Sequence, residues 1–368
     1  MAVILFYSPF NQRSRDTEAL MIAFSRQGHR VISLSQQAGK DIHDFLRPYG
    51  IEPHSFIPVN TNPWVRHLKH FRFLIRFCRE NKVDVVYSHL ESANFIASVA
   101  QFFIRGRVYI CRHHADQYGL LGLDRDLSYR VTYRLARHII AFSETSKNYM
   151  IEHEGVPADK ITKINLAYDF SLYTQPVPAH VEAIRQEVSA DILLITVGSF
   201  YPLKRPGLSI EVLKALVDKG HRAALILLGQ GELDSELKSM ARDLGLERRV
   251  FFPGYVPNVL DYITASTFLL HPSVSESSCV AVKEAGMVSK PIIVCRGVGD
   301  FDDYLVHEQN GFSVDKDNFV DEAAGLILKN FDHRNYLHQL GENLKKTILD
   351  TFGVQNILTQ YADLNKPR

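Results

Sequence analysis

The sequence predicts an α/β protein made of two doubly wound, Rossmann-like domains. With 368 residues, the chain is longer than a single hydrophobic core usually supports. Apolar runs of strand length alternate with segments of helical periodicity, which is the pattern of parallel βαβ units. The alternation is interrupted once, by Pro176-Val177-Pro178 and a charged helix, and then starts again.

The individual elements follow from the same periodicities. In the first half, strands are predicted at 3–7, 31–34, 83–87, 108–111 and 138–142, and helices at 17–27, 64–80, 92–103 and 127–136. In the second half, strands are predicted at 192–197, 224–228, 250–252, 268–271 and 291–295, and helices at 208–219, 233–244, 259–265, 279–288 and, in several pieces, 319–361.

These elements divide the chain into four parts. We expect an N-terminal domain over 1–172, a linker over 173–190, a C-terminal domain over 191–350, and a last helix over 351–368 that packs back on the N-terminal domain. Open α/β sheets bind ligands at the carboxyl ends of their strands. A cleft that both domains face is therefore the expected site.

Composition and charge exclude several classes of protein. The 46% hydrophobic and 23% charged residues are typical of globular domains, and no apolar run approaches the roughly 18 residues of a membrane span. The first residues lack a basic start and predict a strand, not a signal peptide, and four scattered cysteines favour a reduced, cytoplasmic protein. Residues 1–170 hold 22 lysines and arginines against 16 acids, which favours an anionic partner for that half, although not nucleic acid.

The strongest chemical signal is a pair of carboxylates: Glu276 stands at the entry of the helix predicted at 279–288, and Glu284 stands in its middle. If the segment is helical throughout, their backbones lie roughly 12 Å apart, comparable to the reach from hexose to ribose in a nucleotide sugar. The amides of Ser278, Cys279 and Val280 between them would form a helix N-terminus, which binds anions such as a diphosphate. A solvated acidic pair on a surface helix is the alternative.

Three further loops follow predicted strands of the same domain. Their notable residues are, in chain order, Gly198, Ser199, Lys204, Arg205, Gly229, Gly231, Tyr255 and Val256. Glycines permit tight turns, the two cations place positive charge at a strand end, and the backbone at Tyr255 can meet a base edge. All four loops are compatible with one bound nucleotide, although a Gly-x-Gly turn alone is equally typical of a plain turn.

The ordered set of motifs resembles a known family. The motifs are Val197-Gly198-x5-Lys204, Leu228-Gly229-Gln230-Gly231, Phe252-x-Gly254-Tyr255-Val256, His271-Pro272-Ser273-x2-Glu276-x7-Glu284 and Asn310-Gly311-Phe312. In this order and spacing they resemble the retaining GT-B glycosyltransferases of family 4. The resemblance implies transfer of a sugar from a UDP- or GDP-sugar donor to a glycan or lipid-linked acceptor, in the synthesis of cell-surface polysaccharide or glycolipid.

The resemblance also implies roles for single residues. Glu284 would hold the ribose hydroxyls, Glu276 would contact the transferred sugar, Lys204 would neutralise the diphosphate, and the Tyr255-Val256 backbone would meet the base. In the N-terminal half, the strand ends at 84–89 and 109–114 resemble the two that face the sugar. They make His113 or His114 the active-site histidine, unless both are ordinary strand-end residues.

The chain departs from the family's pattern in the donor loops. Ser199 stands where an arginine usually shares the diphosphate with the lysine, and Arg205 or Arg112 are candidates to replace it. Ser277-Ser278-Cys279 replaces a small-aromatic-glycine run, so the family gives no donor sugar for this chain. These departures leave two other functions open: a nucleotide-sugar epimerase or hydrolase, and a non-catalytic nucleotide-sugar-binding protein.

Two segments have the letters of a metal-binding Asp-x-Asp motif. The family's pattern places Asp300-Phe301-Asp302 in a loop that binds no metal, and Asp124-Arg125-Asp126 is typical of a solvated helix start. Fixed cations and a helix N-terminus can stabilise a departing diphosphate without a metal ion. We therefore expect neither a metal nor another cofactor.

The segment 64–82 combines an apolar stripe with a basic face. The apolar residues are Trp64, Leu68, Phe71, Leu74, Ile75 and Cys78, and the basic ones are Arg66, Lys69, Arg72, Arg76, Arg79 and Lys82. One interpretation is a helix packed on the core with a solvated basic face. The other is a peripheral surface for an anionic membrane that carries a lipid-linked acceptor, which would place the protein at the inner face of the membrane.

Overall fold

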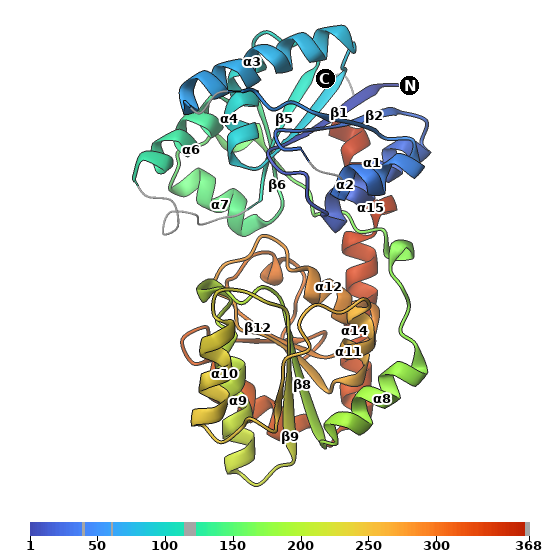
Figure 1. The fold of residues 1–368 in the computed structure, drawn as a ribbon, viewed down its shortest axis with the longest axis vertical. Coiled ribbons are helices and arrows are strands. Elements are labelled where there is room, and N and C mark those ends of the chain that lie inside the picture. The colour runs from blue at the N-terminus through green and yellow to red at the C-terminus, as the bar shows by residue number, and fades with distance from the viewer. Residues whose placement is uncertain (39–40, 60–61, 114–122, 365–368) are drawn as a thin grey trace. The chain divides into compact units, whose positions relative to one another are not determined.

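The structure is a computed structural model that describes residues 1–38, 41–59, 62–113 and 123–364 (Figure 1). The chain forms two compact units, one made of residues 1–169 and 352–368 and the other of residues 170–351. In the described part of the chain the strands form two parallel sheets, one of seven strands in the first unit and one of six in the second.

The first sheet has the strand order β3-β2-β1-β4-β5-β6-β7. Its strands are β1 (Val3–Ser8), β2 (Arg30–Ser35), β3 (Glu52–Ser55), β4 (Val85–His89), β5 (Arg107–Arg112), β6 (His138–Ala141) and β7 (Ile161–Lys163). The helices of this unit are α1 (Arg15–Arg26), α2 (Asp41–Leu46), α3 (Pro63–Glu80), α4 (Glu91–Ala100), α6 (Leu123–Leu135), α7 (Glu144–Glu152) and α15 (Val354–Leu364). Every residue of β4 is buried, as expected of a central parallel strand covered on both faces.

The second sheet has the strand order β10-β9-β8-β11-β12-β13. Its strands are β8 (Ile192–Val197), β9 (Ala223–Leu228), β10 (Val250–Phe251), β11 (Phe268–His271), β12 (Ile292–Cys295) and β13 (Phe312–Val314). The helices of this unit are α8 (Pro178–Val188), α9 (Gly207–Asp218), α10 (Asp234–Asp243), α11 (Val259–Ala265), α12 (Val280–Met287), α13 (Phe319–Asn330) and α14 (Arg334–Phe352). In Figure 1, α9 and α10 cover one face of this sheet, and α11, α12 and α14 lie on the other side.

The segment expected as a linker, 173–190, belongs to the second unit. Its helix α8 packs against α11, and Arg185 donates hydrogen bonds to the carbonyls of Thr264 and Ala265 at the end of α11. The charged helix expected after Pro176-Val177-Pro178 is therefore α8, with proline in its first turn, but it is packed on the second unit and is not a free connection.

The last helix, α15, belongs to the first unit. It packs against α1, and Tyr361 lies edge-on against Phe24 and Tyr87 in the core of that unit. The carbonyl of Leu364 accepts hydrogen bonds from Arg107 and Tyr109 of β5, each at 2.9 Å. These contacts join the end of α15 to the sheet of the first unit.

Helix α3 buries a narrower face than its sequence predicts. His70, Leu74, Phe77 and Cys78 are buried, whereas Trp64 is 79% exposed and Leu68 is 47% exposed. The apolar stripe was correct for the second half of the helix but wrong for its first two turns. Along the described residues, every helix is too short or too polar to span a bilayer.

Candidate active site

The strand order of the second sheet brings the four motif loops to one edge. Strands β10, β9, β8 and β11 are neighbours in that order, and all run parallel, so their carboxyl ends lie side by side. The loops at 252–256, 229–231, 198–205 and 272–279 leave from these four ends. This edge is the place where open α/β sheets bind ligands.

The loops after β8 and β9 lie directly against each other. The amide of Gly198 donates to the carbonyl of Leu228, and the amide of Phe200 donates to the carbonyl of Gln230, both at 3.0 Å. A Cβ on Gly229 would lie 1.9 Å from the carbonyl oxygen of Gly198, and the φ of Gly229 is +150°. Only glycine fits there, so the Gly-x-Gly turn is required by packing; Ser199 is exposed at its rim.

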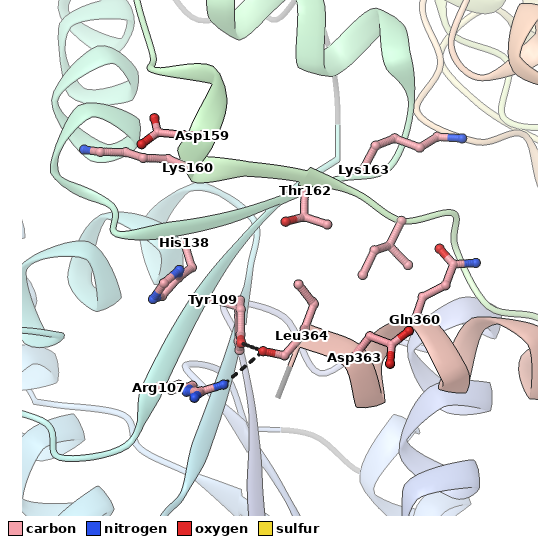
Figure 2. Close-up of a pocket in the computed structure, with 11 residues that line it drawn as sticks. Arg107, Tyr109, His138, Asp159, Lys160, Thr162, Lys163, Gln360, Asp363 and Leu364 are labelled. Atoms are coloured by element: carbon pink, nitrogen blue, oxygen red, sulfur yellow. Dashed lines mark hydrogen bonds between the residues drawn. The ribbon is translucent and has the colours of Figure 1, made fainter. Parts of the chain in front are cut away.

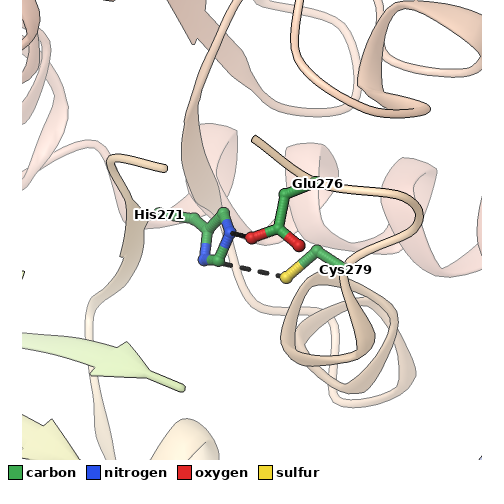
Figure 3. Close-up of side chains that lie close together, drawn as sticks. All are labelled: His271, Glu276 and Cys279. Carbon is green, nitrogen blue, oxygen red and sulfur yellow. Dashed lines mark hydrogen bonds and ion pairs between the residues drawn. The ribbon is translucent and has the colours of Figure 1, made fainter. Parts of the chain in front are cut away.

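Glu276 is the centre of a buried, charged cluster (Figure 3). Its Oε1 lies 2.6 Å from Nε2 of His271, at the end of β11, and 2.5 Å from Nζ of Lys204. Glu276 is 7% exposed and lies in the loop before α12, so the condition for a spacing of roughly 12 Å, a helix that runs from Glu276 to Glu284, is not met. The structure thus joins Lys204 and Glu276, and it adds His271, which sequence reasoning had not assigned to the site.

The charges of this cluster support one another. Burial opposes ionisation of Glu276, but His271 and Lys204 outweigh it and hold the pKa of the carboxyl well below its ordinary value. Burial would likewise lower the pKa of His271, but Cys279 and Glu276 raise it to about 10. Glu276 is therefore a carboxylate between two cations at neutral pH.

Helix α12 begins at Val280, with Cys279 as its N-cap residue. The Cys279 side chain makes no capping bond to the described residues, and the hydroxyl of Ser277 likewise has no partner among them. The side chain of Ser278 is held in place, because its hydroxyl donates a hydrogen bond to Oδ2 of Asp300. The amides at this helix start lie in the loop that carries Glu276.

A fully buried ion pair supports that loop. Lys283 of α12 and Asp300, in the loop after β12, have 0% exposed side chains, and Nζ lies 2.7 Å from Oδ2. The phenol of Tyr304 also accepts from Lys283, at 3.3 Å. Asp300, the first residue of the segment that matches the Asp-x-Asp pattern, thus pairs with a lysine. The side chains of Asp124 and Asp126, in the other matching segment, lie outside the described residues.

Two other expected donor residues take defined positions. Glu284 is 7% exposed in the middle of α12, whereas Tyr255 is 90% exposed beside the partly buried Val256. The guanidinium of Arg205 donates to the carbonyls of Pro272 and Lys316, both at 2.8 Å, and so ties two loops together. Arg112, the other suggested replacement for the family's arginine, is buried in the first unit beside Glu154.

The first unit has its own cluster at the carboxyl edge of its sheet. His89, at the end of β4, and His113, just after β5, lie 3.0 Å apart between Nδ1 and Nε2. Both line a cavity of about 200 Å³ with Phe10, Gln12 and Arg13 of the loop after β1. Burial and the neighbouring His113 hold the pKa of His89 well below its ordinary value, and His114 lies outside the described residues.

Leu90, next to His89, has φ +66° and ψ 167°, a conformation that residues other than glycine rarely adopt. Strained backbone of this kind concentrates at functional sites. It therefore supports this edge of the first unit as part of a site.

A larger hollow of about 620 Å³ lies elsewhere on the first unit (Figure 2). It opens beside the amino-terminal ends of β5 and β6, where Arg107 and His138 begin these strands, and Leu364 borders it. This edge is opposite to the one where α/β sheets place their ligands. We therefore assign the site to the carboxyl edges and not to this pocket.

Comparison with solved structures identifies the class of fold. The chain superposes on HepE from Anabaena in complex with UDP-glucose with a TM-score of 0.84, 21% identity and 99% of both chains covered. The two Rossmann-like units are those of the GT-B glycosyltransferase fold.

The family follows from two sequence models that together span most of the chain. The Glycosyltransferase Family 4 model matches residues 15–172, and the model of glycosyl transferases group 1 matches residues 181–347. The chain belongs to the group 1 glycosyltransferases of the family 4 type. The N-acetyl-alpha-D-glucosaminyl L-malate synthase of Bacillus anthracis is 24% identical over 294 residues, with 78% of this chain and 75% of the relative covered. A UDP-Gal:alpha-D-GlcNAc-diphosphoundecaprenol alpha-1,3-galactosyltransferase of Escherichia coli is 20% identical over 313 residues, with 82% and 79% covered.

Proposed function

We propose that the protein is a retaining, metal-independent hexosyltransferase that moves a sugar from a UDP- or GDP-sugar to a glycan or lipid-linked acceptor. The observation that carries the proposal is the buried Glu276, held between Lys204 and His271 beside the start of α12. Similarity to HepE, which was solved with UDP-glucose, and to a galactosyltransferase that uses UDP-Gal and a diphosphoundecaprenol acceptor supports the donor and acceptor classes. Synthesis of cell-surface polysaccharide or glycolipid fits these relatives.

The donor would lie along the carboxyl edge of the second sheet. Glu276 contacts the sugar, Lys204 and the amides at Ser278, Cys279 and Val280 meet the diphosphate, and Glu284 holds the ribose. As the sugar–phosphate bond stretches, the fixed positive charge stabilises the leaving group. The leaving phosphate oxygen then takes the proton of the acceptor hydroxyl on the same face. The protein therefore needs no covalent nucleophile.

Replacing Glu284 with alanine is expected to weaken donor binding at least about tenfold, because charge-assisted hydrogen bonds contribute about 1.5–3 kcal/mol each. Calorimetric titration with a nucleoside diphosphate measures the effect. A suitable control is Glu322→Ala, in the same unit, whose carboxylate accepts a hydrogen bond from the exposed amide of Asp315 at 3.0 Å. Unchanged affinity in a folded Glu284→Ala protein would contradict the ribose assignment.

Nucleoside diphosphate release tests the reaction itself. With a matching donor and acceptor, release should depend on the acceptor and should continue in excess EDTA, because Lys204 and the start of α12 take the place of a metal. Release without any acceptor would instead indicate a hydrolase, an epimerised donor would indicate an epimerase, and donor binding without turnover would indicate a binding protein. Loss of turnover in EDTA that manganese or magnesium restores would contradict metal independence.

The acceptor side would belong to the first unit, with His113 and His89 at its carboxyl edge.

We also propose that α3 and the neighbouring segment with Phe103 bind the surface of an anionic membrane. Trp64, Leu68 and Phe103 are 79%, 47% and 61% exposed, so three large apolar side chains face water at α3 and the segment that follows α4. The basic residues of the same helix are Arg66, Lys69, Arg72, Arg76 and Arg79. Exposed aromatics among basic residues are typical of interfacial helices.

The protein should therefore sediment with vesicles that contain acidic lipid at low salt, and dissociate as ionic strength rises. The reason is screening: the Debye length falls from about 30 Å at 0.01 M to about 8 Å at 0.15 M salt. Replacing Arg66, Lys69 and Arg76 with glutamine should abolish sedimentation while donor affinity is kept, since the donor residues belong to the other unit. If the wild-type protein does not bind acidic vesicles at low salt, α3 is a helix packed on the core with a solvated basic face.

A further inference from the structure

Cys279 and His271 form a thiol–imidazole pair inside the charged cluster. The Sγ of Cys279 lies 3.7 Å from Nδ1 of His271, and the other ring nitrogen, Nε2, lies 2.6 Å from Glu276 (Figure 3). The three residues are 6%, 4% and 7% exposed. Sulfur, nitrogen and oxygen donors are thus collected in one buried place, and each imidazole nitrogen faces a different partner.

This geometry matches that of a metal-binding histidine and its neighbours. Zinc bonds of about 2.3 Å to sulfur and about 2.0 Å to nitrogen place tetrahedral ligands about 3.5 Å apart, close to the separation of Sγ and Nδ1. A metal-bound histidine usually donates its other ring N–H to a carboxylate, which is the place that Glu276 takes. The potential ligand atoms of His271, Glu276 and Cys279 all lie within 4.8 Å of one another, which keeps the two ligands and the outer carboxylate in one compact group.

We propose that Cys279 and His271 bind one thiophilic divalent cation, such as Zn²⁺ or Cd²⁺, and that this ion inhibits the transferase. Binding replaces the proton of the thiol and the proton at Nδ1 by one metal ion, so two protons leave as two bonds form. Thiolate and imidazole select zinc and cadmium over magnesium and calcium, which prefer oxygen ligands. This regulatory ion is distinct from a catalytic metal, which the reaction does not need.

The inhibition rests on the proposed function. Cys279 is the N-cap residue of α12, and Glu276 is the residue assigned to the sugar. An ion at this position adds positive charge beside Lys204 and fixes both Glu276 and the start of α12. The donor sugar and its diphosphate then lose their contacts, so the ion competes with the donor.

Titration of the full chain with cadmium, in the absence of any substrate, tests the site directly. A thiolate–cadmium charge-transfer band should appear and saturate at one ion per chain. Cys279→Ser should lose the band, and His271→Gln should weaken cadmium binding by at least about 10–100-fold, since loss of even an outer partner of a metal site costs that much. Cys295→Ser is the matched control, because Cys295 is also a free, buried cysteine of the second unit, and it should keep the band.

Circular dichroism and thermal unfolding show whether the variants fold, and Cys279→Ala is a second variant if Cys279→Ser does not. No band in the wild type at one equivalent of cadmium, or a band kept in Cys279→Ser, would overturn the site. Zinc should raise the donor KM of the wild type; inhibition that persists equally in a Cys279 variant with residual turnover would overturn the regulatory role. Since the cadmium band needs no turnover, a protein that binds cadmium but transfers no sugar would contradict the proposed transferase alone.

Discussion

Glu276→Gln should lower the turnover number by about 100-fold or more while the protein stays folded. The amide has nearly the same shape as the carboxylate but no charge, so Lys204 and His271 lose the anion that lies 2.5 and 2.6 Å from them. In the proposed reaction, Glu276 also contacts the sugar as positive charge develops on it. Losses of about 10²–10³ in turnover are typical when one preorganised electrostatic group is removed.

Steady-state kinetics with varied donor measure this effect, and the turnover number should fall more than the donor KM rises. Glu308→Gln is the matched control: Glu308 is also a carboxylate of the second unit paired with a lysine, Lys329 at 3.0 Å, but it is exposed at the surface. That variant should keep wild-type turnover. Turnover of Glu276→Gln close to that of the wild type would exclude a central role for the cluster.

Lys283→Met should destabilise the second unit by about 3–5 kcal/mol, because it leaves the carboxylate of Asp300 buried without the ammonium that faces it. Desolvation already raises the pKa of Asp300, although Lys283 and Ser278 oppose the rise. Without Lys283 the carboxyl must be neutral or reach water. Denaturant unfolding followed by a probe in the second unit measures the loss.

The double variant Lys283→Met with Asp300→Leu should recover much of that stability, since replacing both members of a buried pair by apolar groups is often neutral. It should not recover donor affinity, because Ser278 loses the acceptor that holds its hydroxyl. A Lys283→Met protein as stable as the wild type would show that Asp300 is solvated or already protonated.

The fold could be predicted where the pattern is strong and local. The buried strands β1, β8 and β9 have long apolar runs, and the sequence located both ends of each strand to within one residue. The strands β3, β7 and β13 were missed, because each has only three or four residues and lies toward the edge of its sheet. Their sequences, Glu-Pro-His-Ser, Ile-Thr-Lys and Phe-Ser-Val, also lack the uninterrupted apolar run that located the equally short β11.

The motifs identified several residues of the site, but they did not show which of these residues contact one another. Lys204 and Glu276 were assigned separately, and the structure joins them across 72 positions of the sequence. His271 was part of a motif, but nothing in the sequence shows which nitrogen meets Glu276 and which meets Cys279. Lys283 and Asp300 form a pair only because α12 and the loop after β12 pack together. Likewise, the periodicity of α3 gave its apolar face but not the length of helix that the core covers.

The return of α15 to the first unit has a consequence for the order in which the chain folds during synthesis. The second unit is continuous, from 170 to 351, so it is complete as soon as those residues have left the ribosome. The first unit is synthesised earlier. However, the face of α1 that packs against α15, including the ring of Phe24, stays uncovered until Tyr361 has been made. Domains usually fold in the order in which they are made. Here the unit that is made first is finished last, so part of its apolar surface stays accessible to chaperones until α15 has been made.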